Sequence, residues 1–156
     1  MKFLPLLLGL MLPACGSGTD GVARPQPMDM TAIVRPRTPN TALAAPAGFT
    51  PAPDVATPVY SQPAARLFAA ICDVAARQPR TFKQVAYDDR LQVHFVVRSA
   101  LLGFPDLVTV QATPHGEDAA TLIIWSRSVY GRSDLGVNRR RVDAWLAALD
   151  AGGARA

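Results

Sequence analysis

The side chains best suited to chemistry lie close together near the end of the chain, between an apolar segment and an amphipathic one. Hydroxyl, carboxylate, amide and guanidinium groups crowd this stretch, and its candidate ligand-binding residues are Ser126, Arg127, Ser128, Ser133, Asp134, Asn138 and Arg139. A helix that begins here presents free backbone N–H groups and a partial positive charge. Arginine can add two parallel hydrogen bonds to a carboxylate or a phosphate. The pattern therefore predicts a site for an anion.

Two earlier residues join this set of candidates. Arg98 closes an alternating apolar segment and Asp106 follows the next loop. A second hypothesis uses them for catalysis: a small hydrolase or transferase in which His94 or Asp106 is the base while Arg98 and Arg127 stabilise charge. A third hypothesis is a structural envelope factor that acts through its linker and edge strands.

A purely structural interpretation of the same polar residues also stays open. Asp134 or Asn138 can cap the following helix, and Arg127 can pair with Asp106 or Asp134. The hydroxyls of Ser126 and Ser128 can satisfy backbone groups at a strand end.

Motifs that announce an enzyme or a metal site do not occur. The chain has no CxxC pair, no HExxH, no glycine-rich phosphate loop and no GxSxG, and its only histidines are His94 and His115. We assign no catalytic residue, metal or cofactor. A non-catalytic domain that binds an anionic small molecule, an envelope polymer or a partner protein is the leading hypothesis.

Positive charge is concentrated in the same stretch. The formal net charge is +4, and residues 126–141 hold five arginines against the single carboxylate of Asp134. Such a patch attracts anions, acidic lipids or nucleic acid, although a solvated helix start would look the same. Nucleic acid is not expected, because the chain carries an export signal and no aromatic side chains interleave with the arginines to stack bases.

The first residues predict export. Lys2 precedes an apolar run over residues 3–12, which is shorter than the roughly 20 residues that span a bilayer. The tetrad that ends at Cys15, Leu-Pro-Ala-Cys, resembles the lipobox of bacterial lipoproteins. That resemblance implies a signal peptide over 1–14 and acyl chains such as palmitate on Cys15. The protein would then lie in the cell envelope, facing the periplasm, and Gly16 slightly favours the outer membrane. A plain signal peptide is the alternative.

Composition divides the rest of the chain. Residues 15–62 hold the lipidated cysteine and a proline-rich segment. Closely spaced prolines exclude helices and central strands, so we expect this segment to be a tether that packs in part on the domain. Residues 63–150 form the domain and 151–156 a tail. With Cys15 acylated, Cys72 has no partner for a disulfide, and we expect it to be a small apolar residue of the core.

Periodicity predicts the elements of a single small α+β domain. A helix runs from Pro63 to about Gln78, strands cover residues 81–87, 91–98, 107–113 and 119–128, and a last helix is capped by Asn138. In sequence order the elements are a helix, four strands and a helix. The short connections favour an antiparallel sheet of the four strands, with both helices packed on one face of it.

Three motifs resemble a known family. Ser126-Arg127-Ser128, Gly131, Ser133 to Arg139 and Arg141 are similar to the closing signature of the family called domain of unknown function 1499. Arg98-Ser99 with Phe104 and Asp106 is similar to its middle motif, and Arg35 to Asn40 to its proline-rich lead-in. The chain departs from the pattern at Val129-Tyr130, Arg132 and Pro105, so Asp106 stands alone where two acids are common. The resemblance implies an envelope or plastid-lumen location and a small α+β domain, but no reaction.

Overall fold

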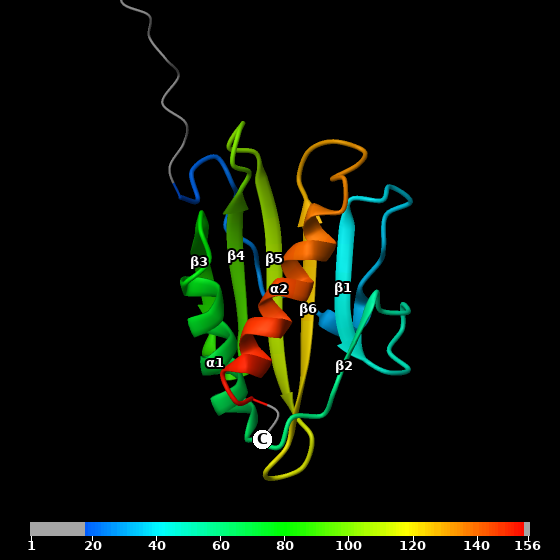
Figure 1. Cartoon of the computed structure of the whole chain (residues 1–156), viewed down its shortest axis with the longest axis vertical. Coiled ribbons are helices and arrows are strands. Elements are labelled where there is room, and N and C mark those ends of the chain that lie inside the picture. Colours follow the sequence, from blue (N-terminus) through cyan, green and yellow to red (C-terminus); the bar gives the residue numbers. More distant parts are fainter. Residues whose placement is uncertain (1–17, 155–156) are drawn as a thin grey trace, which may run out of the picture.

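The computed structural model describes residues 18–154 as one mixed sheet with two helices against one of its faces (Figure 1). The strands are β1 (Thr41–Pro46), β2 (Val55–Thr57), β3 (Thr81–Tyr87), β4 (Gln92–Arg98), β5 (Pro105–Pro114) and β6 (Ala120–Ser128). The helices are α1 (Ala64–Ala76) and α2 (Val137–Ala151), with short 3-10 turns η1 (Met30–Ala32) and η2 (Asp88–Arg90). The fold is a small single α+β domain.

The sheet has six strands in the order β2-β1-β6-β5-β4-β3, so the predicted four-stranded antiparallel sheet is wrong. Strand β1 pairs antiparallel with β6 and brings Leu43 opposite Trp125, while β2 joins β1 in parallel. Both added strands come from the segment that the prolines marked as a tether. The physical reason is that Pro39 and Pro46 bound β1 rather than interrupt it, so its ladder keeps its donors.

Strand β1 also lacks the usual signals of a strand. Its sequence, Thr-Ala-Leu-Ala-Ala-Pro, has little β-branched or aromatic content, and alanine has low β-propensity. Ala42 and Ala44 belong to the core under the helices, whereas Leu43 and Ala45 belong to a second cluster on the opposite face. A strand buried on both faces shows no alternation in its sequence.

The larger core lies between the sheet and the two helices. Leu67 and Ile71 of α1 and Trp145 and Leu149 of α2 pack there against alternate residues of the strands. The ring of Trp145 meets that of Phe95 edge to face, with 5.6 Å between the centroids. This packing fixes α2 across the strands, and its first turn therefore lies by the end of β6 and the start of β5 (Figure 1).

The opposite face of the sheet is covered by the segment before β1. Met30 and Ile33 pack on Leu43 and Trp125. Nearer Gly18, side chains of the sheet hold the segment by its backbone: Gln84 donates to the carbonyls of Val22 and Ala23, Tyr87 to that of Pro25 and Gln92 to that of Met28. Residues 18–33 thus form a strap that crosses this face, and the name strap is kept for them below.

The proposed signal peptide and Cys15 lie outside the described residues. Cys72, on α1, is half-buried, and burial raises the pKa of its thiol to about 11. Between Gly18 and Ala154, no helix combines the length and the apolar character needed to cross a membrane.

Candidate functional site

The first turn of α2 is held by the carboxylate of Asp134. Its two oxygens accept hydrogen bonds from the backbone N–H groups of Gly136 (2.9 Å) and Asn138 (2.8 Å). Gly136 has a φ of 77°, a left-handed conformation that glycine adopts without steric cost. Burial acts to raise the pKa of Asp134, but the N–H groups of Asn138 and Gly136 outweigh it and hold the pKa below its usual range. Asp134, one of the two predicted capping residues, therefore satisfies the helix start.

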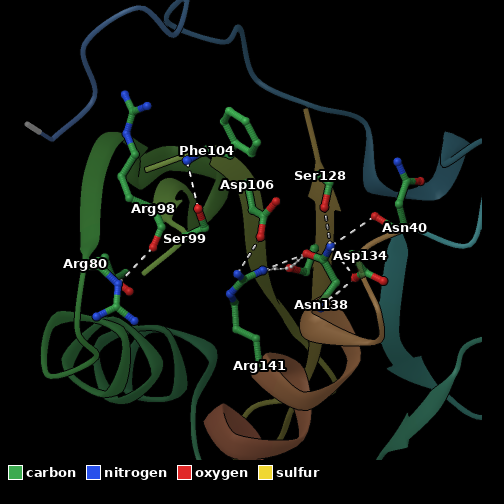
Figure 2. A network of polar contacts seen from close by, with 12 residues as sticks. Asn40, Arg80, Arg98, Ser99, Phe104, Asp106, Ser128, Asp134, Asn138 and Arg141 are labelled. Carbon is green, nitrogen blue, oxygen red and sulfur yellow. Dashed lines mark hydrogen bonds and ion pairs between the residues drawn. The ribbon is translucent and has the colours of Figure 1, made fainter. Parts of the chain in front are cut away.

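Asn138 is the centre of a buried polar network instead of the helix cap (Figure 2). Its side chain is fully buried. The amide oxygen accepts from Ser126 Oγ at 2.6 Å and from Arg141 Nη1 at 2.7 Å. The amide nitrogen has Asp134 Oδ2, Ser128 Oγ and the Asn40 carbonyl within 2.7–3.1 Å, three acceptors for two hydrogens. This one amide joins α2, β6 and the loop before β1.

A nearly buried ion pair closes the network. Arg141 Nη2 lies 2.7 Å from Asp106 Oδ2, with only 10% and 11% of the two side chains exposed. Nη1 of the same guanidinium also donates to Ser126 Oγ at 2.9 Å. Both charges therefore have hydrogen-bonded partners, as the interior requires.

Asn40 extends the network to the loop after β6. Its Nδ2 donates to the Gly131 carbonyl at 2.9 Å, and its own carbonyl accepts from the backbone N–H of Ser128 at 3.0 Å. The sequence placed Asn40 in the proline-rich lead-in but gave it no role. Its position directly before β1, opposite the end of β6, explains why its main chain and side chain both bind the closing motif.

The structure brings together five of the nine predicted site residues and separates the other four. Gathered around α2 are Asp106, Ser126, Ser128, Asp134 and Asn138. The separated residues are Arg98, Arg127, Ser133 and Arg139. Arg139 pairs at 3.0 Å with Asp143 on an exposed face of α2, and Ser133 Oγ accepts from the N–H of Leu135.

Arg98 and Arg127 lie on the opposite face of the sheet. Because successive side chains of a strand alternate, Arg127 points away from its neighbours Ser126 and Ser128. Burial lowers the pKa of its guanidinium. Arg98 donates to the carbonyls of Gly18, Asp20 and Gly103, and Figure 2 shows its guanidinium directed away from Arg141. Neither arginine pairs with Asp106 or Asp134.

His94 shares that face, so the sheet separates it from Asp106. Desolvation, with a smaller contribution from the charge of Arg127, lowers the pKa of His94 to about 4, and the ring is neutral near pH 7. Its Nε2 donates to Gln92 Oε1 at 3.1 Å, which leaves Nδ1 to accept from Thr109 Oγ1 at 3.0 Å. The adjoining cavity, lined by His94 and Arg127, is about 20 Å³, room for one water. The catalytic hypothesis needs His94, Arg98 and Arg127 around one cleft. His94 and Arg127 do line this small cavity together, but Arg98 is not among its lining residues and Asp106 lies on the other face of the sheet.

An open groove of about 410 Å³ adjoins the buried network. Its walls are the first half of α2, the turn before β3 and the end of β4, and its basic side chains are Arg80, Arg140 and Arg141. Arg98 borders the groove, but its guanidinium is directed to the strap. Val97, Val137 and Trp145 supply apolar surface. Of the described residues that line the groove, none carries a carboxylate. The volume lies within the range of small-molecule sites, roughly 300–1,000 Å³.

Two exposed arginines at the groove are held by backbone carbonyls. Arg80 Nε donates to the Arg98 carbonyl at 3.1 Å, and Arg140 Nη1 donates to the Leu135 carbonyl at 2.9 Å. Arg80 has a φ of 54°, which side-chain-bearing residues rarely adopt. The sequence prediction missed both residues as ligand candidates. The signal for the second was its helical spacing, since Val137, Arg140, Arg141 and Ala144 share one face of α2.

The comparisons place the chain in a family. The sequence matches the family described as protein of unknown function (DUF1499) over residues 33–149, which is most of the chain. The chain therefore belongs to that family, and the resemblance seen in its motifs is confirmed. No curated protein matches it. In the described part of the chain, no group of three or more His, Cys, Asp or Glu side chains is placed to hold a metal ion.

Proposed function

We propose that this member of the DUF1499 family is a non-catalytic, lipid-anchored envelope protein whose domain binds an anionic group in the groove beside α2. The supporting observation is the groove's arginine lining without a carboxylate. The ligand is a small molecule, or part of an envelope polymer or partner protein, that carries phosphate, sulfate or carboxylate.

The balance of charges at the groove favours Arg80 and Arg140 as the residues that bind the anionic ligand. Asp106 neutralises Arg141, so that guanidinium mainly supports the wall of the groove. Arg80 and Arg140 each donate to a backbone carbonyl, which orients the guanidinium without cancelling its charge. A guanidinium has five N–H donors, so each residue keeps several for a ligand. Val137, which is exposed at the groove, suits a ligand with an apolar portion next to its anionic group.

The backbone of Arg80 gives a second reason. A left-handed conformation costs a residue with a side chain about 1–2 kcal/mol, and glycine would avoid that cost. The Arg98 N–H donates to the Arg80 carbonyl at 2.9 Å, and with the Arg80 side-chain bond this holds the conformation. A strained arginine at the wall of the groove supports a role for Arg80 in binding.

A thermal-shift experiment tests the groove. The full chain in mild detergent is titrated with phosphate, sulfate and carboxylate compounds, alone and attached to apolar groups. A ligand at 100 times its dissociation constant stabilises the fold by about 2.7 kcal/mol. We expect this shift to disappear in Arg140→Ala and Arg80→Ala. It should persist in Arg139→Ala, the matched control, because Arg139 pairs with Asp143 outside the groove. An equal shift in all four proteins would refute the groove as the site.

The lipid anchor has a separate test. Support for it comes from the Leu-Pro-Ala-Cys tetrad that ends at Cys15. Mass spectrometry of the envelope fraction should find a mature chain that begins at Cys15 and carries acyl chains, and Cys15→Ser should lack that modification. An unacylated mature chain would contradict the anchor while leaving the groove untouched.

A further inference from the structure

Exposed apolar side chains gather on two loops at one end of the sheet. They are Leu101, Leu102 and Phe104 in loop 99–104, and Val129, Tyr130 and Leu135 in loop 129–136. Leu101 is 88% exposed and Leu135 84%, so they contribute little to the fold. Contiguous exposed apolar surface on a soluble domain marks an interaction site.

The two loops form one connected surface. The rings of Phe104 and Tyr130 are 5.9 Å apart, and the Val129 N–H donates to the Pro105 carbonyl. Loop 99–104 is closed on itself, because Ser99 N–H donates to the Phe104 carbonyl and Ser99 Oγ accepts from the Phe104 N–H. Leu101 and Leu102 are thereby held at the tip of a closed loop.

The strap enters the domain at this same end (Figure 1). Arg98 binds the carbonyls of Gly18 and Asp20, and a hollow of about 250 Å³ between strap and loops is lined by Asp20, Leu102, Phe104 and Tyr130. Gly18 follows Cys15 by three residues, a span of at most roughly 10 Å. A lipid on Cys15 would therefore hold these loops next to the bilayer.

Charge distinguishes this end from the other. Arg132 is exposed in loop 129–136, and the exposed Arg80 and Arg140 lie at the neighbouring groove. The acids at this end are Asp20 of the strap and Asp134, whose carboxylate is taken up by the start of α2. The turn between β5 and β6, at the opposite end of the sheet, carries Glu117 and Asp118. Arginines beside apolar loop tips suit a membrane surface with anionic headgroups.

We infer that loops 99–104 and 129–136 form a membrane-docking surface, which inserts its apolar tips among anionic lipids and orients the domain. The inference rests on the proposed lipid anchor at Cys15. In this orientation the acidic turn at Glu117 faces away from the membrane, and the groove opens close to the bilayer surface.

Tryptophan fluorescence tests the inference with the full chain reconstituted in vesicles. Trp125 and Trp145 are buried and give a constant background. In Leu102→Trp, brominated lipids mixed with phosphatidylglycerol should quench most of the added emission and shift it to the blue. The matched control, Asp118→Trp, should show neither effect.

Three outcomes would overturn the inference. Equal quenching at both positions means that the domain has no fixed orientation. Equal quenching of Leu102→Trp without phosphatidylglycerol refutes the choice of anionic lipids. A blue shift in detergent-free solution without vesicles indicates a protein occupant. The readout is independent of the proposed function, because fluorescence quenching reports membrane docking, the thermal shift reports anion binding in the groove, and the mass of the chain reports acylation.

Discussion

The guanidinium of Arg141 on α2 meets the carboxylate of Asp106 on β5 at 2.7 Å, in surroundings that leave about a tenth of either side chain exposed. The pair connects the last helix to the centre of the sheet, between residues 35 positions apart in sequence. Ser126 and Asn138 bind the same guanidinium.

Removing one member of this pair should strongly destabilise the domain. We expect Asp106→Ala to lower the free energy of unfolding by about 3–5 kcal/mol, because it leaves the Arg141 charge buried without its counterion. Arg141→Met combined with Asp106→Leu should recover much of that loss. Urea unfolding measures both variants. The control is Asp143→Ala, which breaks the exposed pair with Arg139 and should cost less than about 1 kcal/mol. Equal losses of stability in Asp106→Ala and Asp143→Ala would contradict the structural role of the Arg141–Asp106 pair.

Asn138 should tolerate substitution as poorly as any residue of the domain. In Asn138→Ala, the buried groups of Ser126, Ser128 and Arg141 lose a partner, and unsatisfied buried polar groups cost about 1–3 kcal/mol each. Asn138→Asp should be no better, because it places a second carboxylate beside Asp134. Thermal unfolding of both variants measures the effect. A decrease of less than about 1 kcal/mol in the free energy of unfolding would mean that the network contributes little to stability.

The pH dependence of stability should show the buried neutral ring of His94. Its pKa in the folded protein, about 4, lies below the ordinary value of 6.5. Between these values the unfolded chain binds a proton that the folded chain does not, so stability is complete above pH 6.5 and falls as the pH drops toward 4. Urea unfolding from pH 7.5 to 4 should reveal the decline. In His94→Gln, where no imidazole titrates, the decline should be reduced. If His94→Gln leaves the fall of the unfolding free energy with pH unchanged, other titratable groups cause that fall.

Arg80→Gly should separate stability from binding. Glycine relieves the left-handed backbone but loses the bond to the Arg98 carbonyl, so stability should stay level or rise by up to about 1 kcal/mol. Anion binding in the groove should weaken. Arg80→Ala keeps the strained backbone and should lose stability as well as binding. Thermal unfolding and titration with the ligand distinguish the two variants. Unweakened binding in Arg80→Gly would remove that residue from the proposed site.

The elements from α1 to α2 were predictable because each carries a local signal. Strand β4 alternates, β5 and β6 are rich in β-branched residues, and Pro63 and Pro79 bracket α1. Strands β1 and β2 were not predictable. An alanine-rich segment between prolines becomes a strand only because β6 offers it a partner buried on both faces.

The site was predicted as a stretch of sequence but not as a set of partners. Ile123 and Trp125 are as apolar as Leu122 and Ile124, so the pattern of β6 does not reveal which face meets the helices. The face that holds Ser126 could not be told from the face that holds Arg127. For that reason the sequence offered Arg127 as a partner of Asp106 or Asp134. Arg141, three residues after Asn138 on α2, is the residue that pairs with Asp106.

The way the sheet holds its strap has a consequence for how the chain can change over time. Gln84, Tyr87, Gln92 and Arg98 all bind main-chain carbonyls of the strap. Main-chain carbonyls are the same whatever residue bears them. Substitutions in residues 18–28 can therefore accumulate while the path of the segment is inherited intact. The family match begins only at residue 33. Relatives can therefore share this strap without recognisable similarity in its sequence. The four donor side chains on the sheet are the residues that would identify the strap in a relative.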